Sequence, residues 1–297
     1  MGASDVLSIR YAVMVSTRGC PHICNFCTSP LMGGFKNYRK RDNDDVIAEI
    51  KWLHDEFNVA EIQFLDDNFF VSKLRVKDLC RRLATNFPDM KFSVPAGTEI
   101  NALDNEMIDL LANANFYRLT LAIESANPDI QSEQIDKHVN LDRIPELIQY
   151  AQNNGIEVRA FFMIGFPGES RESVLRTAEF ALSLNLDDIA LSVVTPLPGT
   201  PIGDETLSKK QLRDDFNPND IRYSVSSIRI EGMSADELED VRRNTWLAHQ
   251  SRKAIKNSQT TNVNIDYAKA AKFATAGFAN KARVGFSGYV SKSNLVV

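Results

Sequence analysis

The chain has 297 residues, of which 43% are hydrophobic, and its formal net charge is -5. A chain of this size can bury a large core, either in one α/β barrel or in two smaller domains. The acidic balance argues against a dedicated nucleic-acid-binding protein, and no apolar run approaches the length of a membrane span.

The N-terminal residues lack the charged and apolar regions of a signal peptide. Reduced thiols without an export signal predict a cytoplasmic protein. One basic cluster, Lys36, Arg39, Lys40 and Arg41, interrupts the acidic composition. We interpret it as a solvated face rather than a phosphate site, because surface charge runs are commonly hydrated.

The first predicted strand, Ala12–Thr17, leads into a loop with three of the four cysteines, Cys20, Cys24 and Cys27. Thiolates bind soft metals and iron–sulfur clusters. With only three thiolates in C-x-x-x-C-x-x-C spacing, one iron of a four-iron cluster would lack a protein ligand. An open coordination position is typical of a catalytic metal centre rather than a structural one.

Two alternatives to a cluster remain at this point. A zinc site would need a fourth ligand, which His22 would supply, although zinc sites usually come as paired or mixed Cys/His sets. The other alternative is clustering of thiols without a metal. The fourth cysteine, Cys80, lies alone in a helical pattern, which predicts a core residue.

Beyond the loop, apolar strand-like runs alternate with amphipathic helical patterns. Six strands separated by helices predict a parallel sheet with right-handed crossovers. The pattern alone does not decide between an open doubly wound sheet and an incomplete barrel. The other predicted strands are Ala60–Leu65, Phe92–Ala96, Tyr117–Ile123, Ile156–Ile164 and Ile189–Val194, and the predicted helices are Val46–Phe57, Leu74–Phe87, Asp104–Ala114, Leu141–Asn153 and Ser170–Leu184.

After Pro201 the alternation ends. Residues 203–233 contain one strand-like piece, Ser224–Ile230, and then Ser234 and Glu237 form a capping-box pair that predicts a helix to about Lys256. The remainder is rich in Ala, Ser, Asn and Lys, with room for a short helix at Asp266–Ala274. The predicted organisation is a core over 1–202, an extension over 203–256 and a loosely ordered tail over 257–297.

Polar and glycine-rich segments follow the predicted strands, where parallel α/β folds place functional groups. Carboxylates there can accept hydrogen bonds from ribose hydroxyls or an ammonium group, and glycine allows close backbone approach. The segments are Asp66-Asp67-Asn68, Glu124-Ser125, Gly165-Phe166-Pro167-Gly168-Glu169 and Pro196-Leu197-Pro198-Gly199-Thr200, and the fifth strand carries Arg159.

The cysteine loop and these segments, from about Tyr11 to Thr200, resemble the radical S-adenosylmethionine (SAM) superfamily, and more narrowly its cobalamin-type branch. The resemblance implies a partial (β/α)6 barrel with a C-terminal helical extension. It also implies that the three cysteines hold a [4Fe–4S] cluster whose open iron binds SAM. One electron then splits SAM, and the resulting 5′-deoxyadenosyl radical takes a hydrogen atom from the substrate. The implied partners are a small-molecule substrate and an electron donor such as flavodoxin or ferredoxin.

The same resemblance assigns roles to individual residues. Asp66, Asp67 and Asn68 would meet the amino group of SAM, and Glu124 and Ser125 would lie near its ribose and methionine part. Lys137 would meet the SAM carboxylate. The adenine would lie along Gly165, Pro167 and Gly168, and Pro196–Thr200 matches a turn after the sixth strand. Arg159 is a further candidate, although a buried arginine is as often part of a core ion pair as a ligand.

The chain departs from the patterns of this superfamily's branches in four respects. Only 19 residues precede Cys20, and no Asp-x-His-x-x-Gly pattern occurs. Cys80 alone cannot bind a second cluster, and Glu99 stands where relatives often have arginine. We therefore expect a one-cluster radical SAM enzyme acting on a small molecule. The alternatives are the catalytic core of a cobalamin-dependent methyltransferase, a non-catalytic iron–sulfur electron-transfer protein, or a zinc-stabilised binding module.

Overall fold

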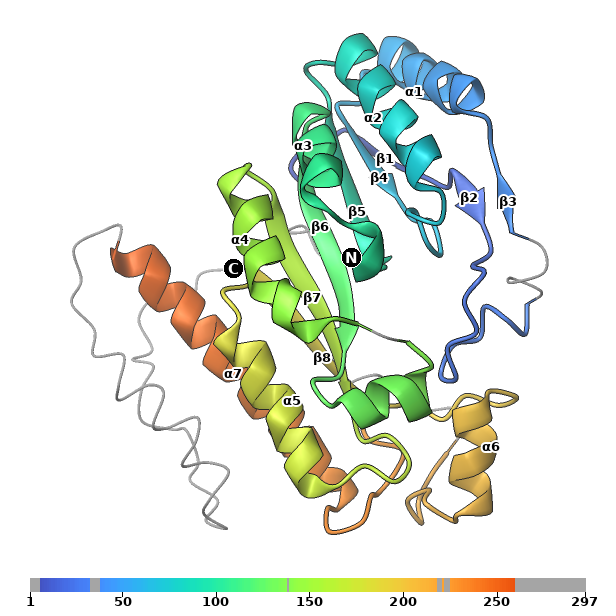
Figure 1. Ribbon diagram of the computed structural model, residues 1–297, viewed down its shortest axis with the longest axis vertical. Helices are drawn as coiled ribbons and strands as arrows, with labels where there is room; N and C mark the ends of the chain where they lie inside the picture. Colours follow the sequence, from blue (N-terminus) through green and yellow to red (C-terminus); the bar gives the residue numbers. More distant parts are fainter. Residues whose placement is uncertain (1–5, 33–37, 138, 218–220, 222–224, 260–297) are drawn as a thin grey trace.

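The computed structural model describes residues 6–32, 38–137, 139–217, 221 and 225–259. A six-stranded parallel sheet forms its centre, with the strands in the order β1-β4-β5-β6-β7-β8 (Figure 1). Doubly wound sheets reverse their strand order at one point, and this sheet does not. The fold is therefore the partial barrel that the resemblance implied. The strands are β1 Tyr11–Met14, β4 Glu61–Phe64, β5 Lys91–Thr98, β6 Phe116–Glu124, β7 Glu157–Ile164 and β8 Asp188–Val193.

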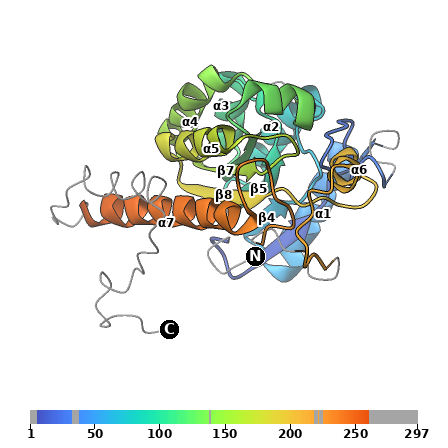
Figure 2. The ribbon, with the colours of Figure 1, turned by 90° about the horizontal axis from the view of Figure 1, so that it is seen from below.

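The crossover helices cover one face of this sheet (Figure 2). Several begin at a side-chain cap, as when Asp104 accepts a hydrogen bond from the backbone N–H of Met107. All five predicted helices are confirmed to within a few residues at their ends. They are α1 Asn43–Phe57, α2 Lys73–Asn86, α3 Asn105–Asn113, α4 Ile144–Asn153 and α5 Arg171–Ser183, with 3-10 turns at Ile100–Ala102 and Leu141–Arg143.

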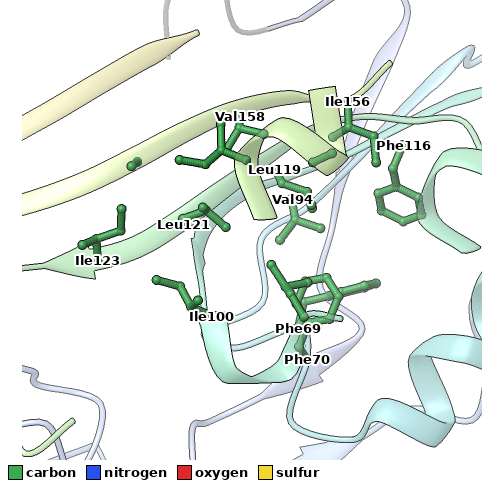
Figure 3. Packing of buried hydrophobic residues seen from close by; sticks show 14 of the residues in the cluster. Phe69, Phe70, Val94, Ile100, Phe116, Leu119, Leu121, Ile123, Ile156 and Val158 are labelled. Carbon is green, nitrogen blue, oxygen red and sulfur yellow. The ribbon is translucent and has the colours of Figure 1, made fainter. Parts of the chain in front are cut away.

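The core lies between the sheet and these helices. Alternate residues of each strand point into it, so Val158 and Phe162 of β7 are buried while Phe161 on the other face is half-exposed. Val94 of β5, Leu119 of β6 and Val158 of β7 lie in register across three adjacent strands and belong to this core (Figure 3). Burying each such side chain stabilises the fold by about 1.5–3 kcal/mol. The opposite faces of the strands form the inner wall of the barrel.

The predicted first strand, Ala12–Thr17, proves to be two strands. β1 ends at Met14, and Thr17–Arg18 forms β2, which pairs with β3, Arg39–Lys40, in a separate antiparallel ribbon. The backbone leaves the sheet between them because Ser16 and Thr17 bond to the side chain of Asp66. The ribbon forms the base of the cysteine loop.

The C-terminal part differs from the prediction in two places. A helix that was not predicted, α6 Pro201–Ser208, spans the proposed boundary at residue 202. The predicted strand Ser224–Ile230 is wrong in its described part, which makes only isolated bridges, from Ile228 to Leu212 and from Ile230 to Met233. These bridges join short turns and extend no sheet. The predicted helix at Asp266–Ala274 lies outside the described residues.

The last described element is α7, Ala235–Gln259. Its predicted capping box is confirmed, because Glu237 accepts from the backbone N–H of Ser234 at 3.0 Å while the Ser234 hydroxyl accepts from the N–H of Glu237 at 3.3 Å. The helix lies along α5 and β8 and so covers the last edge of the sheet (Figure 2). No helix in the described part of the chain is both long and apolar enough to cross a bilayer.

Candidate functional site

The three loop cysteines are half-buried free thiols. Burial raises the pKa of Cys20, and it raises the pKa of Cys24 to about 11, with the neighbouring thiols adding to both shifts. The sulfur atoms are therefore close enough to interact. Within the described ranges, however, no three His, Cys, Asp or Glu side chains converge on a single ion. Such a donor set fits a cluster, in which each thiolate binds a different iron, better than it fits one zinc ion.

The contact made by His22 argues against its role as a fourth zinc ligand. Its Nε2 lies 2.9 Å from Oε2 of Glu99, which follows the end of β5. The contact ties the cysteine loop to the end of a central strand. His22 is thus engaged by the carboxylate of Glu99, the residue at which the sequence departs from the pattern that it resembles.

The segment after β4 anchors the cysteine loop. The buried carboxylate of Asp66 accepts hydrogen bonds from the Ser16 backbone and from the hydroxyls of Ser16 and Thr17. Asp67 accepts from the backbone N–H of Gly19 at 2.9 Å, and Asn68 Nδ2 lies 4.0 Å from the sulfur of Cys20. Asp66 is thereby occupied, whereas Asp67 keeps an exposed carboxylate at the loop.

A buried arginine that was not predicted from the sequence forms hydrogen bonds at both ends of the cysteine loop. Arg75 of α2 donates from Nη2 to the carbonyl of Ser16 and from Nε to the carbonyl of Arg41, each at 3.3 Å. Burial lowers the pKa of Arg75, and the charge of Asp66 opposes that shift. The only sequence signal was an arginine on the apolar face of a predicted helix.

Glu124 ends β6 in the left-handed region, at φ 68°. The side chain is buried, and within the described residues its carboxylate makes no hydrogen bond or ion pair. Burial raises its pKa, and the charge of Lys137 opposes the shift. Lys137 itself donates to the carbonyl of Ala122 at 2.7 Å and also lowers the pKa of Cys24. The charge of Lys137 thus acts on both Cys24 and the buried carboxylate of Glu124.

A π-helix, Ile130–Ile135, supports this end of β6. Its residue Gln131 is buried and donates from Nε2 to the carbonyls of Ile123 and Ser125, both at 2.6 Å. These carbonyls flank Glu124, so one amide fixes the backbone on both sides of the left-handed residue. No motif marks Gln131, and π-helices frequently occur at functional sites.

Two predicted site residues lie elsewhere. The hydroxyl of Ser125 contacts Thr177 of α5 at 3.3 Å and accepts from the N–H of Asn127, so it joins β6 to a helix. Arg159 lies near the start of β7, far from the carboxyl end, and pairs with Asp188 of β8 at 2.7 Å. The structure therefore does not bring either side chain to the cysteine loop.

The turn after β7 is built around the side chain of Glu169. Its Oε2 accepts from the backbone N–H groups of Gly165 and Phe166, and its Oε1 accepts from the Ser173 hydroxyl. Gly165 and Gly168 adopt φ of 85° and 80°, which favour glycine. Beside this turn is a hollow of about 400 Å³, lined in part by Asn127, Ile130, Pro167 and Gly168.

A small apolar cluster holds these segments together at the carboxyl end of the barrel. Phe26 of the cysteine loop packs with the buried side chains of Ile135, Phe166 and Ile202. Two contacts reinforce it: the N–H of Ile202 donates to the carbonyl of Asn25 at 3.3 Å, and Gly199 of the predicted Pro196–Thr200 turn lies against Leu31. Loop, π-helix, β7 turn and α6 thus form one surface.

A comparison with known families matches the part of the chain that contains most of these residues. The sequence model of the radical SAM superfamily matches residues 14–181. The matched range runs from the end of β1 into α5 and includes the cysteine loop, Glu124 and the Gly165–Glu169 turn. It covers the region in which the site residues converge.

The curated relatives are longer proteins. Cytidylyl-2-hydroxyethylphosphonate methyltransferase of Streptomyces wedmorensis is 29% identical over 230 residues, covering 75% of this chain and 42% of the relative. An uncharacterized methyltransferase of Pyrococcus horikoshii is 31% identical over 249 residues, covering 83% and 53%. Anaerobic magnesium-protoporphyrin IX monomethyl ester cyclase of Cereibacter sphaeroides is 23% identical, covering 84% and 40%. The chain spans about half the length of these relatives or less.

Among solved structures, a similar fold occurs in TsrM of Kitasatospora setae, a radical SAM methyltransferase with cobalamin and a [4Fe-4S] cluster bound. It superposes with a TM-score of 0.62 at 19% sequence identity, covering 78% of this chain and 46% of that one. At this identity the likeness shows a shared fold.

Proposed function

The chain belongs to the radical SAM superfamily, whose members are enzymes that use a [4Fe–4S] cluster and SAM, and from this premise we propose how its residues divide the chemistry. We assign the cluster to Cys20, Cys24 and Cys27, one thiolate to each of three irons. These three residues would hold a bound four-iron cluster and would leave one iron without a protein ligand, where SAM could bind. When bound and given one electron, these cofactors supply a 5′-deoxyadenosyl radical.

Glu124 carries the proposed placement of SAM. Among the described residues the buried carboxylate of Glu124 has no hydrogen-bond partner, and such a group is costly unless a ligand supplies donors. SAM offers such donors in its ammonium group and ribose hydroxyls. Lys137 lies near both Glu124 and Cys24, which suits the SAM carboxylate beside the open iron. We therefore place the methionine–ribose part between Glu124 and the cysteine loop.

The two ends of SAM follow from this placement. The adenine lies along Gly165, Pro167 and Gly168, because the hollow beside Pro167 and Gly168 gives a flat group access to the backbone of the turn. At the other end, Asp67 and Asn68 remain candidates for the amino group, since both lie against the loop. Asp66, the third member of that segment, positions the loop through its own hydrogen bonds instead.

The substrate is a small organic molecule that enters the open barrel, and the reaction begins with abstraction of a hydrogen atom. The half-exposed side chains of Phe161 and Met163 support this proposal, because they offer apolar contacts on the other face of β7, where Phe161 lies opposite Ala122 of β6. An apolar wall also excludes water from a reactive radical. The electron comes from a donor protein such as flavodoxin or ferredoxin.

A second candidate function is methyl transfer that requires cobalamin. The relatives favour it, since two are methyltransferases by name and a similar structure contains cobalamin. In that case the segment described here supplies SAM binding and the cluster, and a further domain or a partner supplies cobalamin. The two candidates differ in whether cobalamin is needed before SAM is cleaved.

Replacing Glu124 tests the proposed SAM site. Glu124→Ala removes a charge-assisted hydrogen bond worth about 1.5–3 kcal/mol, which is roughly tenfold or more in affinity. We expect the SAM dissociation constant of the reconstituted protein to rise by that factor, with cluster content unchanged. The EPR spectrum of the reduced cluster should change on adding SAM in the parent protein and much less in the variant.

The matched control is Glu157→Ala, which removes a carboxylate from the start of β7, where Glu157 pairs with Arg118. It should leave SAM affinity unchanged. Equal SAM affinity in the parent protein and in Glu124→Ala would contradict the placement. A spectrum that never responds to SAM would support the electron-transfer alternative.

A further inference from the structure

The β2–β3 ribbon gathers positive charge that the function described above does not use. Arg18, Arg39 and Lys40 are all exposed on it. The strand register places Arg18 directly opposite Arg39. The sequence showed only the run around Arg39, because Arg18 joins it through strand pairing.

This arrangement is electrostatically unfavourable in the protein by itself. Like charges directly opposite in an antiparallel pair destabilise it. Within the described part of the chain, none of the three cations makes an ion pair, whereas Arg41, the next residue, pairs with both Asp45 and Glu49. The chain as a whole carries a net charge of -5, so this patch is a local reversal of sign. A partner with negative charge would relieve the repulsion.

The ribbon lies at the cysteine loop. Gly19 and Cys20 follow Arg18 directly, and the ribbon stands apart from the six-stranded sheet beside β1 and β4 (Figure 1). The loop also exposes large apolar side chains, with Met32 85% exposed and Ile23 and Leu31 each 54% exposed. Protein interfaces combine an apolar centre with a polar rim. A small anion would use the cations alone, so the apolar neighbours favour a protein.

We propose that Arg18, Arg39 and Lys40, together with the exposed apolar side chains of the loop, form the docking surface for a small acidic one-electron-donor protein. The proposal rests on the proposed function, because it assumes a cluster at Cys20, Cys24 and Cys27. In the docked complex one electron leaves the donor's reduced centre and enters the cluster, with no transfer of a proton or other group. The basic ribbon steers the donor to the loop, which raises the association rate.

The test compares two donors with a neutral reductant. The reconstituted full-length protein is mixed anaerobically with a reduced acidic flavodoxin, and separately with a reduced acidic ferredoxin, and the rate of cluster bleaching is followed at several salt concentrations. Photoreduction with an uncharged deazaflavin measures reduction without docking. Binding of the oxidised donor to the protein is measured by calorimetry, which requires no turnover.

Charge reversal should weaken docking only. In Arg39→Glu/Lys40→Glu we expect at least one donor to bind more weakly at low salt and to reduce the cluster about tenfold or more slowly. At high salt the variant and the parent should reduce at the same rate. The rate with deazaflavin should be unchanged. The milder Arg39→Gln should give a smaller effect in the same direction and guards against loss of the loop fold. The control Arg81→Glu makes the same kind of charge change at an exposed position on α2 and should match the parent.

Two results would overturn the proposal. One is reduction and binding by both donors that is independent of salt and unaffected by Arg39→Glu/Lys40→Glu. The other is a patch that binds an oligonucleotide or inorganic phosphate in a manner lost on charge reversal, while neither donor is affected. In both cases a SAM-dependent change in the EPR spectrum after deazaflavin reduction would leave the proposed function standing.

Discussion

At the scale of single residues, the cysteines give the most direct test of the cluster. Cys20→Ala, Cys24→Ala and Cys27→Ala should each lose the intact cluster, because each removes the thiolate of one iron. Iron and sulfide content after anaerobic reconstitution, together with visible absorbance, measure the loss. Cys80→Ala is the control: this thiol is fully buried in α2, so its removal should cost about 1 kcal/mol of stability and leave the cluster intact. Full occupancy in any loop variant would refute the ligand set.

Gln131 is predicted to act on SAM through Glu124. Gln131→Leu keeps the volume of the side chain but removes its bonds to the carbonyls of Ile123 and Ser125, of which Ile123 keeps the N–H of Ser125 at 3.0 Å. The loss costs about 1–3 kcal/mol of stability. Released from this support, Glu124 should leave its left-handed conformation and SAM affinity should fall. In the double variant Gln131→Leu/Glu124→Ala, affinity should be no lower than in Glu124→Ala alone. Additive losses would mean that Gln131 acts independently of Glu124.

At the scale of elements, the sequence predicts most reliably the strands and helices that bury one apolar face. The six core strands and five helices were found because their apolar periodicity reflects one buried face, as in β7. Elements held by specific polar contacts escaped prediction. The β2–β3 ribbon depends on Asp66, the π-helix is held by the bonds of Gln131, and α6 starts at Thr200, which caps it by accepting from the N–H of Gly203. None of these contacts has a periodic signal.

The segments that form the candidate site were predictable, but the orientation of their side chains was not. Strand ends that meet at one edge of a parallel sheet identified the segments around Asp67, Glu124 and Gly168. Which side chain in a segment faces the site depends on tertiary partners. Ser125 turns to α5 and Arg159 pairs across the sheet with Asp188, and only the fold brings those partners near. The orientation of each side chain within a matched motif is therefore set by the fold and not by the motif.

The docking of α7 on β8 should depend on pH. Burial lowers the pKa of His249 below its usual range, and the positive charges of Lys253 and Arg252 add to the shift. The carboxylate of Asp188 and a hydrogen bond with the backbone of Asp187 oppose it. Because the folded-state pKa is the lower one, the unfolded chain binds more protons as the pH falls. The contribution to stability is complete above the unfolded value of about 6.5 and is lost below it.

We therefore expect the melting temperature to fall between pH 7.5 and pH 5.5, and His249→Gln to reduce that fall. Thermal unfolding followed by circular dichroism at both pH values measures it. His54→Gln, on α1, is the control and should keep the parent's pH dependence. A melting temperature that rises on acidification, or an unchanged slope in His249→Gln, would contradict this role for His249.

At the scale of the whole molecule, the strand order explains how distant segments form one site. A singly wound sheet places all its carboxyl ends on one rim, and the loop, the end of β6 and the turn after β7 meet there. α7 closes the last edge, and its Leu238 packs close to Gly165 in that turn. Substitution at Gly165 would therefore disturb both the turn and the seat of α7. The turn after β7 at the rim is thus in direct contact with α7 of the C-terminal extension.

The same convergence leads to a prediction about the isolated protein. The proposed cluster ligands and the proposed SAM contacts all lie within one matched region, residues 14–181. The reconstituted protein, given SAM and reductant, should therefore form 5′-deoxyadenosine slowly without substrate and without added cobalamin. The true substrate should raise that rate, because a C–H bond held beside the radical offers it a productive reaction. With deuterium at the reacting carbon, the label should appear in 5′-deoxyadenosine, which mass spectrometry detects. Glu124→Ala should lower the rate at limiting SAM, and saturating SAM should restore part of it. If 5′-deoxyadenosine formed only after addition of cobalamin or a cobalamin-bearing partner, the self-contained function would be wrong, and methyl transfer that requires cobalamin would replace it.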